Sequence, residues 1–148
     1  MDKKLKDELR KIFDDFSFLL SNKGYILPTY FLVKDNKVSM LEYERKIDFG
    51  LYSNLAIFKA QKDDADAVVL ISENDAVVGT PSDVSMSAVS KGILKVSDHP
   101  NSKPHLILIY MSSKGNKAAL FGEIEKDPRG TKFVTNQEWV TEITSKVI

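Results

Sequence analysis

The chain has 148 residues, a length typical of one domain, and its 21 basic and 21 acidic side chains cancel to a formal net charge of zero. The absence of cysteine excludes disulfides, thiolate metal sites and a cysteine nucleophile. A neutral chain also argues against nucleic-acid binding, because release of counterions from phosphates favours proteins with a basic excess.

The N-terminus is charged from its second residue, and no apolar run approaches the about 18 residues that cross a bilayer. A secretory signal would need an apolar segment close to that end. We therefore expect a soluble cytoplasmic protein with no membrane partner.

Residues 3 to 21 are predicted to form an amphipathic helix. Its apolar residues recur at steps of three and four, which places them on one face: Leu5, Leu9, Ile12, Phe13, Phe16, Leu19 and Leu20. Asp2 is the predicted N-cap, and Gly24 can take the left-handed conformation that often ends a helix. We expect the apolar face to pack on the domain's own sheet, and a partner-binding helix is the alternative.

Residues 25 to 43 are predicted to form a β-hairpin. Two segments rich in β-branched and aromatic residues flank the turn sequence "KDNK". Pro28 has no N–H to donate, so it belongs at the start of a strand or on a sheet edge.

A second helix is predicted over residues 48 to 62. Asp48 or Ser53 could cap it. Its apolar stripe begins at Ile47 and continues through Leu51, Leu55 and Phe58.

The C-terminal part is predicted to contain mostly strands. Residues 67 to 71 form a continuous apolar run, which is typical of a strand buried on both faces. Residues 105 to 148 are predicted to form a meander, with "DPRG" as a type I turn. Residues 74 to 104 are rich in Ser, Gly, Pro and Asp, which predicts a long irregular loop that hides at most one short strand.

The order of helix, hairpin, helix and consecutive strands predicts a single α+β domain over residues 1 to 148. We expect a largely antiparallel β-sheet with the two main helices packed on one face. The loop over residues 74 to 104 is expected to lie outside this core.

The segments "ADAVVLISE", "DHPNSKPHLILIYMSSKG" and "QEWV" resemble a family of small uncharacterised bacterial and phage proteins, over roughly residues 65 to 140. In that family a "DA-V-V-(I/V)-SEAW" strand precedes a loop with a "P-x-R" element and a strand-rich C-terminal half. This chain lacks the tryptophan, since Asn74 follows Glu73, and lacks the arginine after Pro100. The resemblance implies the order of elements and a phage or mobile-element origin, but no activity.

The two histidines and nearby acids define one candidate active site. Asp98 could support the imidazole of His99, and Glu73 or Asp75 could approach from the end of the preceding strand. Together these four residues would serve a hydrolase or nuclease-like enzyme at a cleft formed by the long loop. His105 is expected to start a buried strand and to lie at the end of that strand as a structural residue.

Motifs for cofactors and metals are incomplete. Asp63, Asp64 and Asp66 cluster between a helix and a strand, but the glycine of an EF-hand loop is missing. No glycine-rich phosphate loop or zinc-binding spacing is present. We therefore expect neither a cofactor nor a metal.

The missing motifs and the neutral charge favour a non-enzymatic domain that acts through protein association, with a homodimer as one form. An exposed sheet edge can pair with a second copy or with an extended peptide. The strand over residues 28 to 33 and the long loop are the expected contact segments. The alternatives are the hydrolase or nuclease-like enzyme described above and nucleic-acid binding through basic residues at two turns, namely Lys114, Lys117, Lys126, Arg129 and Lys132.

Overall fold

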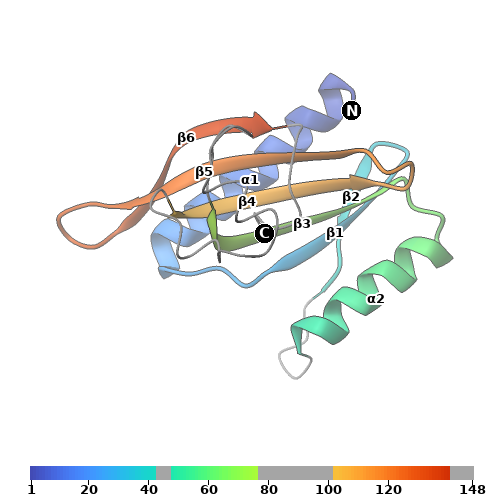
Figure 1. Ribbon diagram of the computed structural model, residues 1–148, viewed down its shortest axis with the longest axis horizontal. Coiled ribbons are helices and arrows are strands. Elements are labelled where there is room, and N and C mark those ends of the chain that lie inside the picture. Colours follow the sequence, from blue (N-terminus) through green and yellow to red (C-terminus); the bar gives the residue numbers. More distant parts are fainter. Residues whose placement is uncertain (43–47, 77–101, 141–148) are drawn as a thin grey trace, which may run out of the picture.

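The structure is a computed structural model, and it describes residues 1–42, 48–76 and 102–140. Within these residues, two helices and six strands follow one another (Figure 1). They are α1 (Lys3–Lys23), β1 (Thr29–Lys34), β2 (Lys37–Met40), α2 (Phe49–Lys62), β3 (Ala67–Ala76), β4 (Lys103–Ser112), β5 (Lys117–Lys126) and β6 (Lys132–Val140). The strands form one antiparallel sheet in the order β2-β1-β3-β4-β5-β6, which confirms the predicted α+β class.

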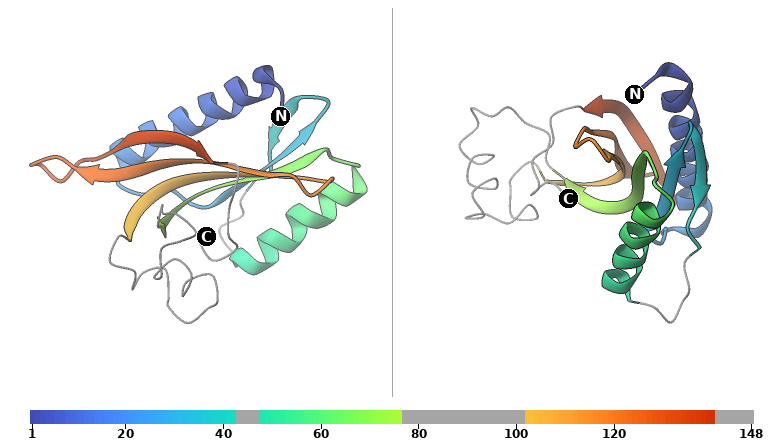
Figure 2. Two further views of the ribbon diagram at one scale, coloured as in Figure 1. Left: turned by 45° about the horizontal axis from the view of Figure 1, so that its top comes forward. Right: turned by 90° about the vertical axis from the view of Figure 1, so that its right-hand side faces the viewer.

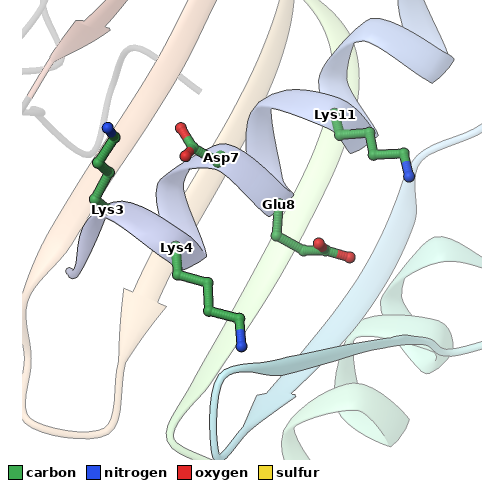
Figure 3. A pocket seen from close by; sticks show the side chains of 5 residues that line it. All are labelled: Lys3, Lys4, Asp7, Glu8 and Lys11. Carbon is green, nitrogen blue, oxygen red and sulfur yellow. The ribbon is translucent and has the colours of Figure 1, made fainter.

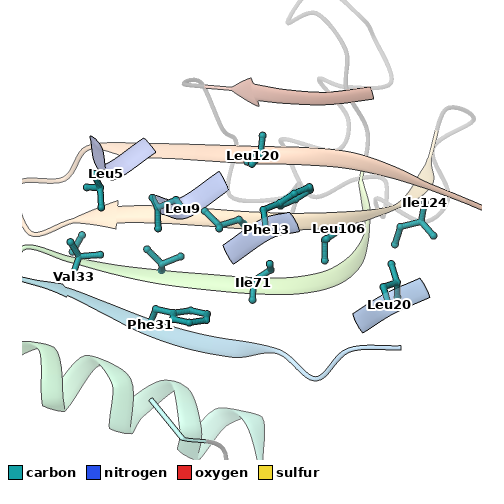
Figure 4. Close-up of a cluster of buried hydrophobic side chains, with 13 residues drawn as sticks. Leu5, Leu9, Phe13, Leu20, Phe31, Val33, Ile71, Leu106, Leu120 and Ile124 are labelled. Carbon is teal, nitrogen blue, oxygen red and sulfur yellow. The ribbon is translucent and has the colours of Figure 1, made fainter. Parts of the chain in front are cut away.

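Both ends of α1 are capped by the residues that the sequence predicts. A carboxylate oxygen of Asp2 accepts the backbone N–H of Leu5 at 2.8 Å, which satisfies one free donor of the first turn. Gly24 ends the helix at φ 81°, and its N–H donates to the carbonyl oxygen of Leu20 at 2.8 Å. The apolar face between these caps covers one face of the sheet, as Figure 4 shows. Its buried residues are Leu5, Leu9, Phe13 and Leu20, and they pack with Phe31, Val33, Val69, Ile71, Leu106, Leu108, Leu120 and Ile124.

Tight turns set the register of the strands. The β1–β2 turn has Asp35 and Asn36 at φ 51° and 61°, the conformation of a two-residue hairpin turn whose twist matches its strands. Between β5 and β6, the N–H of Gly130 donates to the carbonyl of Asp127 at 2.9 Å, so "DPRG" is a turn as predicted. One further residue is inserted in β6 near Asn136, where φ is 53° and the register shifts between Phe121 and Glu123 of β5, which is a β-bulge.

The two helices lie on opposite faces of the sheet, as the left view of Figure 2 shows. Along β1, Phe31 packs in the core under α1, whereas Tyr30 packs with Tyr52 of α2. Neighbouring side chains of a strand point to opposite faces, so α1 and α2 cannot share one. The predicted placement of both helices on one face is therefore wrong for α2.

Two predictions about strand limits also need correction. The region expected to be irregular from residue 74 to 104 is paired at both ends, because β3 continues to Ala76 and β4 begins at Lys103. Residues 77 to 101 lie outside the described residues. The strand that follows Pro28 is not an edge, since β1 pairs with β2 on one side and with β3 on the other. Pro28 itself immediately precedes β1, where its missing N–H removes no hydrogen bond between the strands.

Candidate functional site

The predicted acidic site is only partly described. Glu73 lies on β3, and one of its carboxylate oxygens is 2.9 Å from the ammonium group of Lys132 on β6, with 23% of each side chain exposed. Asp75 lies two residues further on, exposed and opposite Pro104 of β4. Asp98 and His99 lie outside the described residues. The structure thus brings Glu73 to a lysine, and the four-residue site stays a prediction.

A row of polar residues crosses the sheet on the face opposite α1. Asn74 pairs with His105, His105 with Glu123 and Glu123 with Thr135, on four successive strands. His105 is 3% exposed and its ring meets Phe121 edge-on, with the centroids 6.1 Å apart. His105 does not start its strand as predicted, because β4 begins two residues earlier, at Lys103, and is paired on both sides at His105.

Local contacts engage most of this row. Nδ1 of His105 lies 2.7 Å from the carbonyl oxygen of Lys103, and because a carbonyl only accepts, that nitrogen carries the proton. Glu123 accepts a hydrogen bond from Asn136 at 3.1 Å and lies 3.7 Å from the ammonium of Lys103. Within the described ranges, no three His, Asp or Glu side chains are arranged to hold a metal ion. These contacts join residues of the sheet to one another, so they indicate a structural role for the row.

A shallow depression lies on the outer side of α1 (Figure 3). Its lining comes entirely from the first three turns of that helix and carries both charges: Lys3, Lys4, Asp7, Glu8 and Lys11. All five side chains are exposed. Surfaces of this kind are typical of a solvated helix face, so the depression is a weak candidate for a binding site.

Helix α2 is attached to the sheet through few side chains. Only Tyr52 and Ala56 are fully buried, at 1% and 0% exposure. The hydroxyl of Tyr52 accepts the backbone N–H of Tyr30 at 2.9 Å and donates to the carbonyl oxygen of Leu41 at 2.6 Å. Tyr52 therefore fixes the position of α2 on the sheet face.

One exposed flank of α2 is apolar. Leu51, Leu55 and Phe58 recur at steps of four and three and are 49%, 42% and 63% exposed. We call these three residues the outer stripe of α2. On a helix of 3.6 residues per turn they lie on one flank of α2, about 110° around the helix axis from Tyr52 and Ala56. The sequence identifies this stripe, but local periodicity does not reveal that it faces away from the core.

Comparisons with known proteins add no family or relative. No protein-family model, curated protein or solved structure matches the chain. Neither of the two helices in the described part of the chain is long and apolar enough to cross a membrane.

Proposed function

We propose that this protein acts by binding another protein and that the outer stripe of α2 is its contact surface. The observation that carries the proposal is the exposure of Leu51, Leu55 and Phe58 on one side of a single helix. This surface is different from the two segments that the sequence favoured for contact.

The composition of α2 supports this surface. A helix that is apolar around most of its circumference is normally buried, yet α2 buries only Tyr52 and Ala56. Phe49 and Ile57, at 43% and 52% exposure, extend the apolar character beyond the stripe. Apolar side chains gathered in one exposed patch mark interaction sites more often than scattered ones do. Anchors at i, i+4 and i+7 are also the pattern by which helices bind partners.

The sheet edge at β2 is a weaker candidate. The strand that follows Pro28 is internal, and the true edge beside it, β2, has only four residues (Lys37–Met40). Short edge strands offer few free backbone groups to a partner. Helix α2 therefore presents the better contact surface.

Photo-crosslinking in the protein's own host cells tests the proposal. A photoreactive benzoylphenylalanine replaces Phe58 on the outer stripe, and in a matched control it replaces Phe18 on α1, which is 69% exposed. We expect a discrete protein adduct at position 58 that Leu55→Glu removes. The Phe18 probe should give none, because exposure alone does not create a binding surface.

The adduct pattern decides the outcome. Equal labelling at positions 58 and 18 would show that the stripe contacts other proteins non-specifically. No adduct at position 58 would show that the stripe binds no partner. Either result would overturn the proposal.

A further inference from the structure

We propose that the partner of the outer stripe is a second copy of this chain, with the two α2 helices packed antiparallel around a two-fold axis near Leu55. This inference rests on the proposed function and names its partner. The argument comes from the spacing and the charges along α2.

The outer stripe continues into a charged residue at each end of the helix. Asp48 precedes Leu51 by three residues, and Lys62 follows Phe58 by four, so the series Asp48, Leu51, Leu55, Phe58, Lys62 has steps of three, four, three and four. This is the spacing of a seam along which two helices pack against each other. The seam spans the whole of α2, from its N-cap to its last residue.

The seam complements itself only in the antiparallel orientation. A two-fold axis at Leu55 places Leu51 opposite Phe58 of the other copy and Asp48 opposite Lys62. A parallel pair would instead place Asp48 against Asp48 and Lys62 against Lys62, and like charges oppose pairing. The helix dipoles add to this preference, because antiparallel packing puts each positive N-terminus beside a negative C-terminus.

The local contacts are compatible with this pairing. Oδ1 of Asp48 accepts the N–H of Leu51 at 2.8 Å, which leaves Oδ2 for a lysine of the other copy. Lys59 lies 3.4 Å from Asp63, the residue that caps the end of α2, whereas Lys62 lies on the seam. The capping carboxylate and the terminal lysine can therefore meet across the axis without breaking α2.

The expected dimer is weak. Fourteen residues of helix are about 21 Å long, and such a strip buries less than the roughly 800 Å² per partner of a standard interface. We therefore expect a dissociation constant of about 10–500 μM.

Sedimentation equilibrium of the full chain from about 10 μM to 1 mM tests the inference. Wild-type protein should pass from monomer to dimer, and Leu55→Lys should raise the dissociation constant about a hundredfold or more, because it places two lysines at the axis. Ile57→Lys is the matched control. It adds the same charge about 100° around the helix from Phe58, at a side chain that is 52% exposed, and should change the constant less than about twofold.

A second variant tests the orientation without altering the apolar seam. Lys62→Gln should weaken an antiparallel dimer roughly threefold to tenfold, because it removes two symmetry-related charge pairs, and the effect should shrink with added salt. A parallel pair would instead be strengthened. An unchanged or tighter dimer for Lys62→Gln would overturn the antiparallel arrangement.

The two proposals fail in different ways. Wild-type protein that stays monomeric at 1 mM, or an Ile57→Lys variant as weak as Leu55→Lys, would overturn the homodimer. An adduct between position 58 and a different protein would then leave the proposed function standing. The absence of any such adduct would overturn both.

Discussion

Gly122 is a residue of β5 whose lack of a side chain has a direct structural cause. A Cβ atom at this position would lie 2.2 Å from Cγ1 of Val134 on β6 and 3.1 Å from Cζ of Phe13 on α1. Phe13 is fully buried against the sheet, as Figure 4 shows. Glycine therefore lets the central turn of α1 and the last strand approach the same point of β5.

We expect Gly122→Ala to lower the free energy of unfolding by about 1–3 kcal/mol, because the added methyl group overfills a packed site. Urea denaturation measures the change. In the double variant with Val134→Ala, which removes the closest atom, the loss should be smaller than the sum of the two single losses. An additive double variant would contradict this explanation.

Tyr110 on β4 is expected to contribute to the pH dependence of stability at alkaline pH. Burial raises the pKa of its hydroxyl above the usual value of 10.0, and the carboxylates of Asp66 and Asp2 raise it further. The unfolded chain therefore loses this proton at a lower pH than the folded protein does, and the stabilisation present below pH 10 is lost as the pH rises through the folded pKa.

Tyr110→Phe should consequently flatten the fall in unfolding free energy above about pH 10, which urea denaturation at several pH values measures. The control is Tyr25→Phe, since Tyr25 is 59% exposed. It should keep the wild-type slope. Identical slopes for Tyr110→Phe and wild type would show that this hydroxyl titrates alike in both states.

At the scale of elements, the hydroxyl of Tyr52 connects α2 to the backbone of the sheet. Tyr52→Phe would leave the N–H of Tyr30 and the carbonyl of Leu41 without their 2.9 Å and 2.6 Å partner. We expect a loss of about 1–3 kcal/mol in unfolding free energy, because buried backbone groups that lose a hydrogen bond are costly. Thermal and urea denaturation measure it against Tyr25→Phe. A loss no greater than that of the exposed control would contradict the role of the hydroxyl.

Element ends are well predicted by local chemistry. Asp2, Gly24 and Asp48 act on the residues beside them, so the sequence shows where α1 and α2 begin or end. The orientation of α2 is different, because its sequence is apolar on more than one side. Packing against Tyr30 and Leu70 of the sheet determines that Tyr52 and Ala56 are buried, and the outer stripe is left exposed.

At the scale of the whole molecule, spatial order depends on contacts between distant residues. The hairpin and the meander follow chain order, but β3 returns beside β1 after α2, which makes β1 internal. Because the sequence carries no local signal for this return, an edge was predicted where the sheet is continuous.

Prediction of the candidate site from the sequence is limited for the same reason, because its contacts join residues that are distant in the chain. Lys132 meets Glu73 across 59 positions of chain, and strand register alone aligns His105 with Glu123. Neither pairing has a spacing signature in the sequence. The spacing of the outer stripe can be read from the sequence, whereas its exposure depends on how α2 packs on the sheet.

The extra residue in β6 distorts one edge strand of the described sheet. The bulge at Asn136 bends β6 at mid-length, so the backbone groups on the outer side of this strand, which pair with no other described strand, do not form one straight row. A straight row would be a template for adding strands from other molecules, which is how fibrils grow. We therefore expect the bulge to hinder the addition of strands at β6, the longer of the two edge strands of the described sheet.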